Sequence, residues 1–269
     1  MSKKEGERMT RLPNVDFTKT EITKIISMNP IVGGEAYICE GSNPNTLYKI
    51  FFHDQLIDEP LSSYAYGQIT VNDMTEIIPM SYNKLKKIER LYQLQLEGCV
   101  RPLKTISIEG ELVGYEMTKD SFDRVLRPYE LTREALIYYL KQTKAILEYF
   151  ARHNIVFGDV APRNILINPK TRTAKFCDID NIQLAGYEID VKSNELFSYM
   201  LDRGTIDTEA DAYMHSLMTL ECLETDMDLC LKKGRYFHEY FKAPAYEIIE
   251  GIGNPRKYNG EYLIQYVKK

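Results

Sequence analysis

The sequence has few cysteines and histidines, and neither residue type is spaced as metal ligands are. Its five cysteines are scattered, with no Cys-x-x-Cys pair, and its four histidines form no ligand pattern. An odd number of dispersed cysteines predicts reduced thiols. We therefore expect neither a disulfide framework nor a metal site built from cysteine and histidine.

Long apolar runs and an excess of basic residues are missing as well. No run approaches the roughly 18 apolar residues that a bilayer-spanning helix requires, and the charged residues 1–13 lack the apolar core of a signal peptide. The net charge is −5, whereas a protein that binds nucleic acid presents a basic face. We therefore expect a cytoplasmic protein whose partners include neither a membrane nor a nucleic acid.

What is present is the composition of a soluble globular protein. Hydrophobic residues make up 44% of the chain and charged residues 27%, and both shares are ordinary. A chain of 269 residues is long enough to bury a sizeable core, either as one large domain or as two lobes.

The beginning of the chain favours β-structure. Three strands are expected, at residues 22–27, 37–40 and 46–52. Because side chains alternate along a strand, Leu47, Lys49 and Phe51 share one face of the third strand. A lysine on an apolar face has two interpretations: a charge that protects an edge strand from aggregation, or a functional group. Residues 54–79 show no clear period and are interpreted as an irregular insertion.

A helix is expected to follow this insertion. Ser81 is a suitable N-cap, and an apolar stripe continues to about Glu97, after which Gly98 ends the helix. Glu89 lies at the edge of that stripe, where it either faces the body of the protein or pairs with a helix neighbour such as Lys86. Two strands joined by a short turn come next, at residues 100–107 and 111–117.

The second half of the chain is mainly helical. Its clearest helical periodicity begins at Thr132 and continues to about Arg152. Another helix is expected from about Thr208. Residues 184–206 are mixed and loop-like, and residues 236–249 are a weaker helical candidate.

These two halves predict the α+β fold class. The natural division lies near residues 116–121, between the last strand of the first half and the long helix. We therefore expect a β-rich domain of residues 1–117 and a mainly helical domain of residues 118–269.

The most informative stretch follows the long helix, at residues 153–183. Residues 165–167 and 174–177 read as short strands joined by a polar turn, and such a hairpin brings its outer ends close together. The polar residues at those ends are Asp159, Asn164, Asp178 and Asp180. Carboxylate and amide oxygens suit Mg²⁺, which takes oxygen ligands. The hairpin therefore predicts a magnesium site.

The spacing of these residues resembles that of the protein kinases. Residues 157–164 read Phe-Gly-Asp-Val-Ala-Pro-Arg-Asn and resemble the catalytic loop His-Arg-Asp-x-x-x-x-Asn, while residues 178–180 read Asp-Ile-Asp in place of Asp-Phe-Gly. Residues 211–223 resemble the long buried helix of the helical lobe. The chain is similar to a divergent, bacterial-type protein kinase-like family. This resemblance implies a bilobal fold with a β-rich N-lobe and a shortened, mainly helical C-lobe.

The resemblance also implies ATP and Mg²⁺ as cofactors and a role for each matching residue. Asp159 would orient the acceptor hydroxyl and take its proton, and Lys49, held by Glu89, would bind the α and β phosphates. The implied catalytic residues are Asp159, Lys49 and Asn164. The implied nucleotide-binding residues are Gly33, Gly34, Lys49, Glu89, Glu116 and Met117. The implied metal ligands are Asn164, Asp178 and Asp180.

Asp211 has two interpretations. The segment from Thr208 to Asp211 fits a capping box, in which the aspartate closes the N-terminus of its own helix. By the resemblance to kinases, Asp211 would instead anchor the catalytic loop.

The chain departs from the kinase pattern in ways that leave the acceptor open. Gly158 replaces the arginine that in many kinases pairs with a phosphate on the activation segment, so we expect activity that does not depend on phosphorylation there. No Ala-Pro-Glu precedes Thr208, and the peptide-docking part of the C-lobe is shortened. The acceptor is therefore interpreted as a protein Ser, Thr or Tyr hydroxyl, with a small-molecule hydroxyl as the alternative. A nucleotide-binding pseudokinase is a third interpretation, and the joint presence of Lys49, Asp159, Asn164 and Asp178 argues against it.

Overall fold

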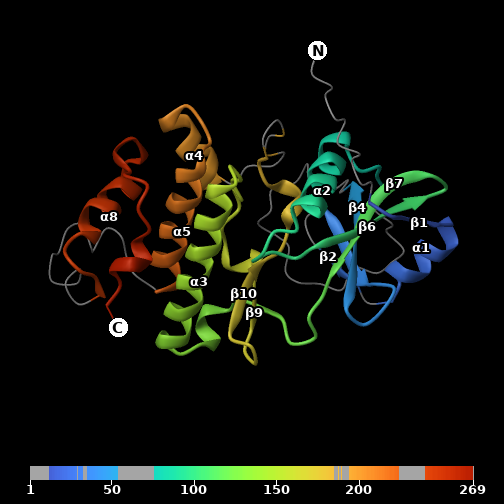
Figure 1. Ribbon diagram of the computed structural model, residues 1–269, viewed down its shortest axis with the longest axis horizontal. Helices are drawn as coiled ribbons and strands as arrows, with labels where there is room; N and C mark the ends of the chain where they lie inside the picture. Colours follow the sequence, from blue (N-terminus) through green and yellow to red (C-terminus); the bar gives the residue numbers. More distant parts are fainter. Residues whose placement is uncertain are drawn as a thin grey trace, which may run out of the picture. The chain divides into compact units, whose positions relative to one another are not determined.

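The computed structural model divides the chain into two compact units (Figure 1). The structure describes residues 12–28, 30–32, 35–53, 76–184, 187, 189, 194–223 and 240–268. The first unit contains residues 1–96 and 101–121, and the second contains residues 97–100 and 122–269. The chain thus passes into the second unit between Ser121 and Phe122, next to the segment 116–121 that separates the predicted halves.

The first unit is built on a sheet whose strands run mostly antiparallel. Its strands are β1 (Asn14–Phe17), β2 (Ile31–Val32), β3 (Ala36–Glu40), β4 (Thr46–His53), β5 (Glu76–Ile77), β6 (Pro102–Ile108) and β7 (Glu111–Thr118). The strand order is β1-β6-β7-β4-β3-β2, and β5 pairs with β4 outside this path. Only the β1–β6 pair is parallel among these. β4 therefore lies inside the sheet, between β7 and β3.

The predicted strand at residues 22–27 is wrong, because this segment belongs to the helix α1 (Lys19–Ile26). A capping box starts the helix: Thr18 Oγ1 accepts a hydrogen bond from Glu21 N, and Glu21 Oε2 accepts one from Thr18 N. Ile22 and Ile26 are one helical turn apart and are buried in the same apolar cluster. The cap and this spacing of four residues favour a helix over the β-propensity of the isoleucines.

The other elements predicted for the first unit are confirmed. The strand predictions for residues 37–40, 46–52, 100–107 and 111–117 correspond to β3, β4, β6 and β7. The helix α2 (Tyr82–Leu94) begins after Ser81, whose Oγ accepts a hydrogen bond from Lys84 N. It ends at Leu94, earlier than predicted, because Gln95 adopts a left-handed conformation. Residues 54–75 of the predicted insertion lie outside the described residues, and Glu76 and Ile77 near its end form the strand β5 rather than irregular structure.

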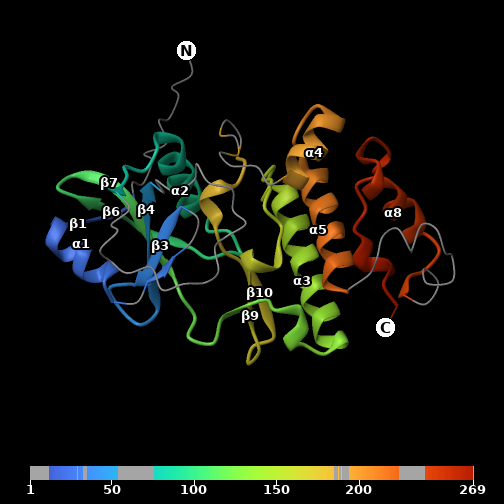
Figure 2. The ribbon, with the colours of Figure 1, turned by 180° about the vertical axis from the view of Figure 1, so that it is seen from behind.

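The second unit combines helices with a small sheet. Its helices are α3 (Arg133–Arg152), α4 (Asn194–Arg203), α5 (Thr208–Cys222) and α8 (Ala245–Gly253), and its strands are β8 (Arg124–Val125), β9 (Ile165–Asn168) and β10 (Thr173–Phe176). The strand order is β10-β9-β8. Figures 1 and 2 show α3 between α5 and the β9–β10 hairpin, and α8 packs on α5. The fold is thus mixed α and β, with the larger sheet in the first half of the chain.

Helix α5 is buried along most of its length, including polar side chains. The ring of His215 is fully buried, and its Nε2 lies 2.9 Å from the carbonyl oxygen of Leu140 and 3.0 Å from Oγ1 of Thr143. The carbonyl oxygen can only accept, so Nε2 carries the proton. Burial lowers the pKa of His215 to about 4, which favours the neutral ring. This neutral histidine joins α5 to α3.

Two predictions for the second unit need correction. The segment 184–206, predicted to be loop-like, contains α4, whose Leu196 and Tyr199 are buried at a helical spacing of three residues. In the helical candidate 236–249, residues 236–239 lie outside the described part of the chain and α8 begins only at Ala245. Among the helices that the structure describes, none combines the length and the apolar character of a membrane span.

Candidate functional site

The second unit fixes the loop that carries Asp159 and Asn164. Two backbone hydrogen bonds join Val156 to Gln183, with N···O distances of 3.1 and 2.8 Å, so the loop lies beside the segment that follows β10. Within the loop, Nδ2 of Asn164 donates to Oδ2 of Asp159 at 2.7 Å and to its carbonyl oxygen at 2.9 Å. These bonds leave Oδ1 as the acceptor atom of the Asn164 amide. The two predicted residues are thus brought together.

The carboxylate of Asp159 also contacts an arginine. Its Oδ1 accepts a hydrogen bond from a guanidinium nitrogen of Arg163 at 2.7 Å. The side chain of Arg163 is 66% exposed, and an ion pair in this environment contributes little to stability because water competes for both charges. The ion pair therefore orients Asp159, and a partner that replaces Arg163 loses little free energy by breaking it.

The predicted hairpin is confirmed, and it brings Asn164 near Asp178. β9 and β10 pair from Asn168 opposite Thr173 to Ile165 opposite Phe176. The ladder extends by one further bond, in which Cys177 N donates to the carbonyl oxygen of Asn164 at 2.9 Å. Asp178 is the next residue.

Asp178 and Asp180 have contrasting positions. Asp178 has φ 61° and ψ 49°, a left-handed conformation that aspartate tolerates better than most residues. The side chain of Asp180, two residues later, is fully buried. The carboxylates of Asp178 and Asp180 each have an oxygen within 4.8 Å of the other, and carboxylate oxygens are donors of the kind that Mg²⁺ binds. The residues that the hairpin gathers fit the cation that the sequence predicts.

Asp211 of α5 anchors the loop that carries Asp159 and Asn164. Its Oδ2 accepts a hydrogen bond from Phe157 N at 2.7 Å, and its Oδ1 accepts one from Gly158 N at 2.8 Å. The capping-box interpretation is wrong, since the N-cap of α5 is Asp207, which accepts from Glu209 N. Burial raises the pKa of Asp211 to about 7, against the opposing effect of the two N–H donors.

The structure gives a reason for glycine at position 158 that the sequence pattern does not reveal. Its φ is +80°, a region that side chains disfavour. A Cβ at this position would also lie 2.4 Å from Cδ1 of Ile189. The positive φ therefore favours glycine here, and any side chain would also require Ile189 to shift.

Lys49 lies in the interior of the first unit's sheet. It stands opposite Ile38 of β3 and Tyr115 of β7, and only 4% of its surface is exposed. The interpretation as an edge-strand charge is therefore wrong. Its Nζ lies 3.5 Å from Oε1 of Glu35 and 5.3 Å from the centroid of the Phe51 ring.

The implied ion pair between Lys49 and Glu89 does not form. Glu89 instead pairs with Lys86, three residues earlier on α2, at 2.6 Å. Within the described residues of this unit, the carboxylate next to Lys49 is that of Glu35. Glu89 keeps the local helix partner that was its alternative interpretation.

Glu116 and Met117 are both buried in β7. The carboxylate of Glu116 accepts hydrogen bonds from the hydroxyl and the N–H of Ser42 and pairs with Lys104 at 3.1 Å. Burial by itself raises the pKa of Glu116, but the donors of Ser42, Thr46 and Lys104 outweigh it and lower the pKa below its usual value. The Glu116 side chain thus braces the sheet. The predicted nucleotide-binding residues Gly33 and Gly34 lie outside the described residues.

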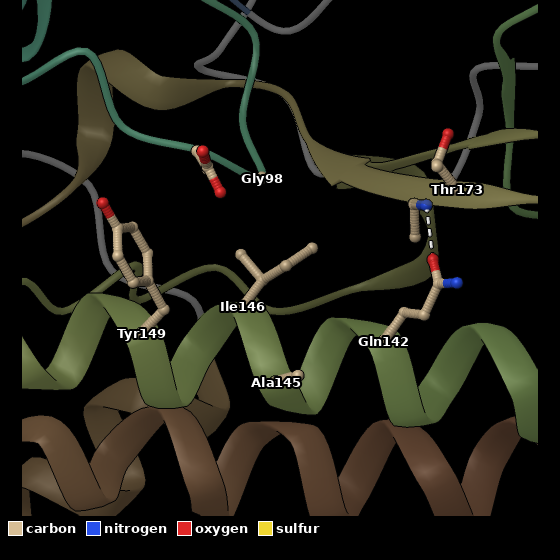
Figure 3. A pocket seen from close by; sticks show the side chains of 8 residues that line it. Gly98, Gln142, Ala145, Ile146, Tyr149 and Thr173 are labelled. Carbon is tan, nitrogen blue, oxygen red and sulfur yellow. Dashed lines mark hydrogen bonds between the residues drawn. The ribbon is translucent and has the colours of Figure 1, made fainter. Parts of the chain in front are cut away.

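A shallow groove of about 400 Å³ between α3 and β10 contains none of the predicted site residues (Figure 3). One of its polar side chains is Gln142, whose Oε1 accepts a hydrogen bond from Ala174 N and whose Nε2 donates to the carbonyl oxygen of Arg172, both at 2.8 Å. Both ends of this amide therefore hold the edge of the hairpin against α3. We interpret the groove as a structural feature of the hairpin's attachment.

Each unit thus carries one part of the predicted set. Asp159, Asn164, Asp178 and Asp180 belong to the second unit, and Lys49, Glu89, Glu116 and Met117 belong to the first. Glu35 and Lys84, which adjoin Lys49, were not indicated by the sequence pattern. Comparison of the sequence with protein-family models gave no match, and comparison with curated proteins gave none either.

Proposed function

We propose that this protein is an ATP- and Mg²⁺-dependent phosphotransferase with a bilobal, protein kinase-like fold. Its acceptor is a hydroxyl group, in the first place that of a Ser, Thr or Tyr side chain of a protein. The observation that carries the proposal is the bond of buried Asp211 to the backbone of the loop that holds Asp159 and Asn164. Hydrogen bonds from the loop backbone to a buried carboxylate of α5 hold the loop in one position, and phosphoryl transfer requires catalytic groups that are fixed in this way.

The roles follow from the chemistry of the groups. Asp159 orients the acceptor hydroxyl and takes its proton once the exposed Arg163 has been replaced. Asn164, Asp178 and Asp180 would hold Mg²⁺, which neutralises charge on the phosphates when it is bound. Lys49 binds the phosphates of ATP.

The small-molecule acceptor remains the second candidate. It is favoured by the sequence between Asp178 and Thr208, where no Ala-Pro-Glu occurs, so a recognisable peptide-docking segment is missing from this stretch. The chemistry at Asp159 would be the same for either acceptor, because each presents a hydroxyl.

Intact-mass measurement after incubation with Mg²⁺ and ATP tests the proposal. We expect a gain of one or more phosphate units in the protein or in an added protein substrate, and no gain with Asp159→Ala. Consumption of ATP without protein labelling, again abolished by Asp159→Ala, would favour the small-molecule acceptor. Binding of ATP with no transfer under any condition would contradict the proposal and favour a pseudokinase.

A further inference from the structure

Two lysines of the first unit converge on one carboxylate. Lys49 of β4 lies 3.5 Å from Oε1 of Glu35, and Lys84 of α2 lies 2.7 Å from Oε2 of the same side chain. Both ammonium groups also lie over the ring of Phe51, at 5.3 Å and 4.4 Å from its centroid. An aromatic face attracts cations, so the ring helps to keep the two ammonium groups on one side of the sheet.

The three charged side chains differ in how they are held. The side chains of Lys49 and Lys84 are 5% and 13% exposed, whereas that of Glu35 is 38% exposed. The lysines extend from a central strand and from a helix, and Glu35 lies in the short segment before β3. The two cations are therefore the fixed part of the cluster, and the carboxylate is the part most accessible to exchange.

The geometry of this cluster matches an anion with several oxygen atoms. Glu35 satisfies two ammonium groups by turning one oxygen toward each. A phosphate group offers at least as many oxygens at a similar separation and a larger charge, and lysine binds phosphate as a point charge without a fixed direction. One phosphate chain could therefore contact both lysines where the single carboxylate does now.

We propose that Lys84 is a second phosphate-binding residue, which acts with Lys49 on the polyphosphate of the nucleotide. Glu35 occupies the place of that polyphosphate when no nucleotide is bound. This inference rests on the proposed function and deepens it. The resemblance to kinases implies that Glu89 of α2 pairs with Lys49. The structure instead brings Lys84 of α2 to Glu35, the carboxylate that also pairs with Lys49.

The test compares Lys84→Met with Lys86→Met. Lys86 is two residues away on the same helix, and its partner is Glu89, so its loss removes the same charge without affecting the cluster. The Kd values for ATP, ADP and adenosine are measured by calorimetry on the full chain. We expect Lys84→Met to weaken ATP and ADP binding by about tenfold, the loss of one charge-assisted bond. Adenosine binding should stay unchanged, and Lys86→Met should resemble wild type.

Two further variants separate the phosphate role from a structural one. Lys84→Arg keeps the charge and should retain most of the ATP affinity. Glu35→Gln removes the competing carboxylate and should tighten ATP binding severalfold relative to wild type, by reducing the competition for the two ammonium groups.

The outcomes distinguish the inference from the function on which it rests. Wild-type protein that binds no ATP would overturn the proposed function and the inference with it. ATP binding that Lys84→Met and Lys86→Met leave equally strong would overturn the inference alone. Equal weakening of ATP and adenosine by Lys84→Met would also overturn it, because the lysine would then support the fold rather than bind phosphate.

Discussion

Replacement of Asp211 by asparagine should release the loop that carries Asp159. The aspartate accepts one hydrogen bond on each carboxylate oxygen, from Phe157 N and Gly158 N. Asparagine has the same shape but only one oxygen, so one of these buried N–H groups would lose its acceptor. An unsatisfied buried N–H group costs about 1–3 kcal/mol, and we expect the free energy of unfolding to fall by this amount.

The sign of the pH dependence follows from the raised pKa of Asp211. The pKa is about 7 in the folded protein and near its ordinary value of 3.8 in the unfolded chain. Protonation therefore stabilises the folded state fully below pH 3.8, and this contribution is lost as the pH rises through 7. The stability advantage of wild type over Asp211→Asn should accordingly be larger at pH 5 than at pH 8.

Hydrogen-exchange mass spectrometry of a peptide covering residues 155–160 is the direct assay. The amides of Phe157 and Gly158 should exchange faster in Asp211→Asn than in wild type. Asp207→Ala is the control, because Asp207 caps the same helix through Glu209 N rather than holding Phe157 and Gly158. It should cost about 1 kcal/mol as a lost cap and leave the exchange of this peptide unchanged. Unchanged exchange in Asp211→Asn would refute the anchoring role.

Three other variants test separate parts of the structure. Asp178→Ala should abolish Mg²⁺-dependent ATP binding in a titration, whereas Asp159→Ala should bind ATP as wild type does and fail to transfer phosphate; equal ATP affinity in wild type and Asp178→Ala would count against the metal ligands. Gly158→Ala should lower the free energy of unfolding in urea by about 2 kcal/mol or more, since it adds a Cβ at positive φ and in contact with a packed side chain. Gly110→Ala, with φ +86° and open space around it, should cost about 1 kcal/mol for the φ alone, and a cost equal to that of Gly158→Ala would contradict the packing argument. His215 has a pKa lowered to about 4 by burial, so wild type should lose stability relative to His215→Gln as the pH falls from 6.5 to 4, and parallel pH profiles of urea unfolding would disprove this.

The parts of the structure that could be predicted are those that depend on nearby residues. The β9–β10 hairpin and the start of α2 at Ser81 follow from strand runs, turn residues and an N-cap, all of which are local patterns. The same kind of pattern marks α1, where Thr18 and Glu21 form a capping box, but the isoleucines after it favoured a strand. Local signals are therefore sufficient to predict α1 only when its N-cap is weighed together with the strand propensity of its isoleucines.

Ion-pair partners could not be predicted in the same way. Glu89 has a lysine three residues away on its own helix, and whether it turns to that lysine or to Lys49 depends on the packing of α2 on the sheet. Lys84 meets Glu35 only because a helix and the segment before β3, which are far apart in the sequence, approach each other. Asp211 illustrates the same limit, since its two interpretations differ in a contact with a loop more than fifty residues away.

The measurement that tests the central claim most directly is the rate at which γ-phosphate is transferred from labelled ATP, in wild type and in Asp159→Asn. The asparagine keeps the shape of the side chain but cannot take a proton from the acceptor hydroxyl. With Mg²⁺ present, we predict transfer by wild type and a loss of at least about 100-fold in the variant, with unchanged ATP binding. Equal transfer rates in the two proteins would contradict the account.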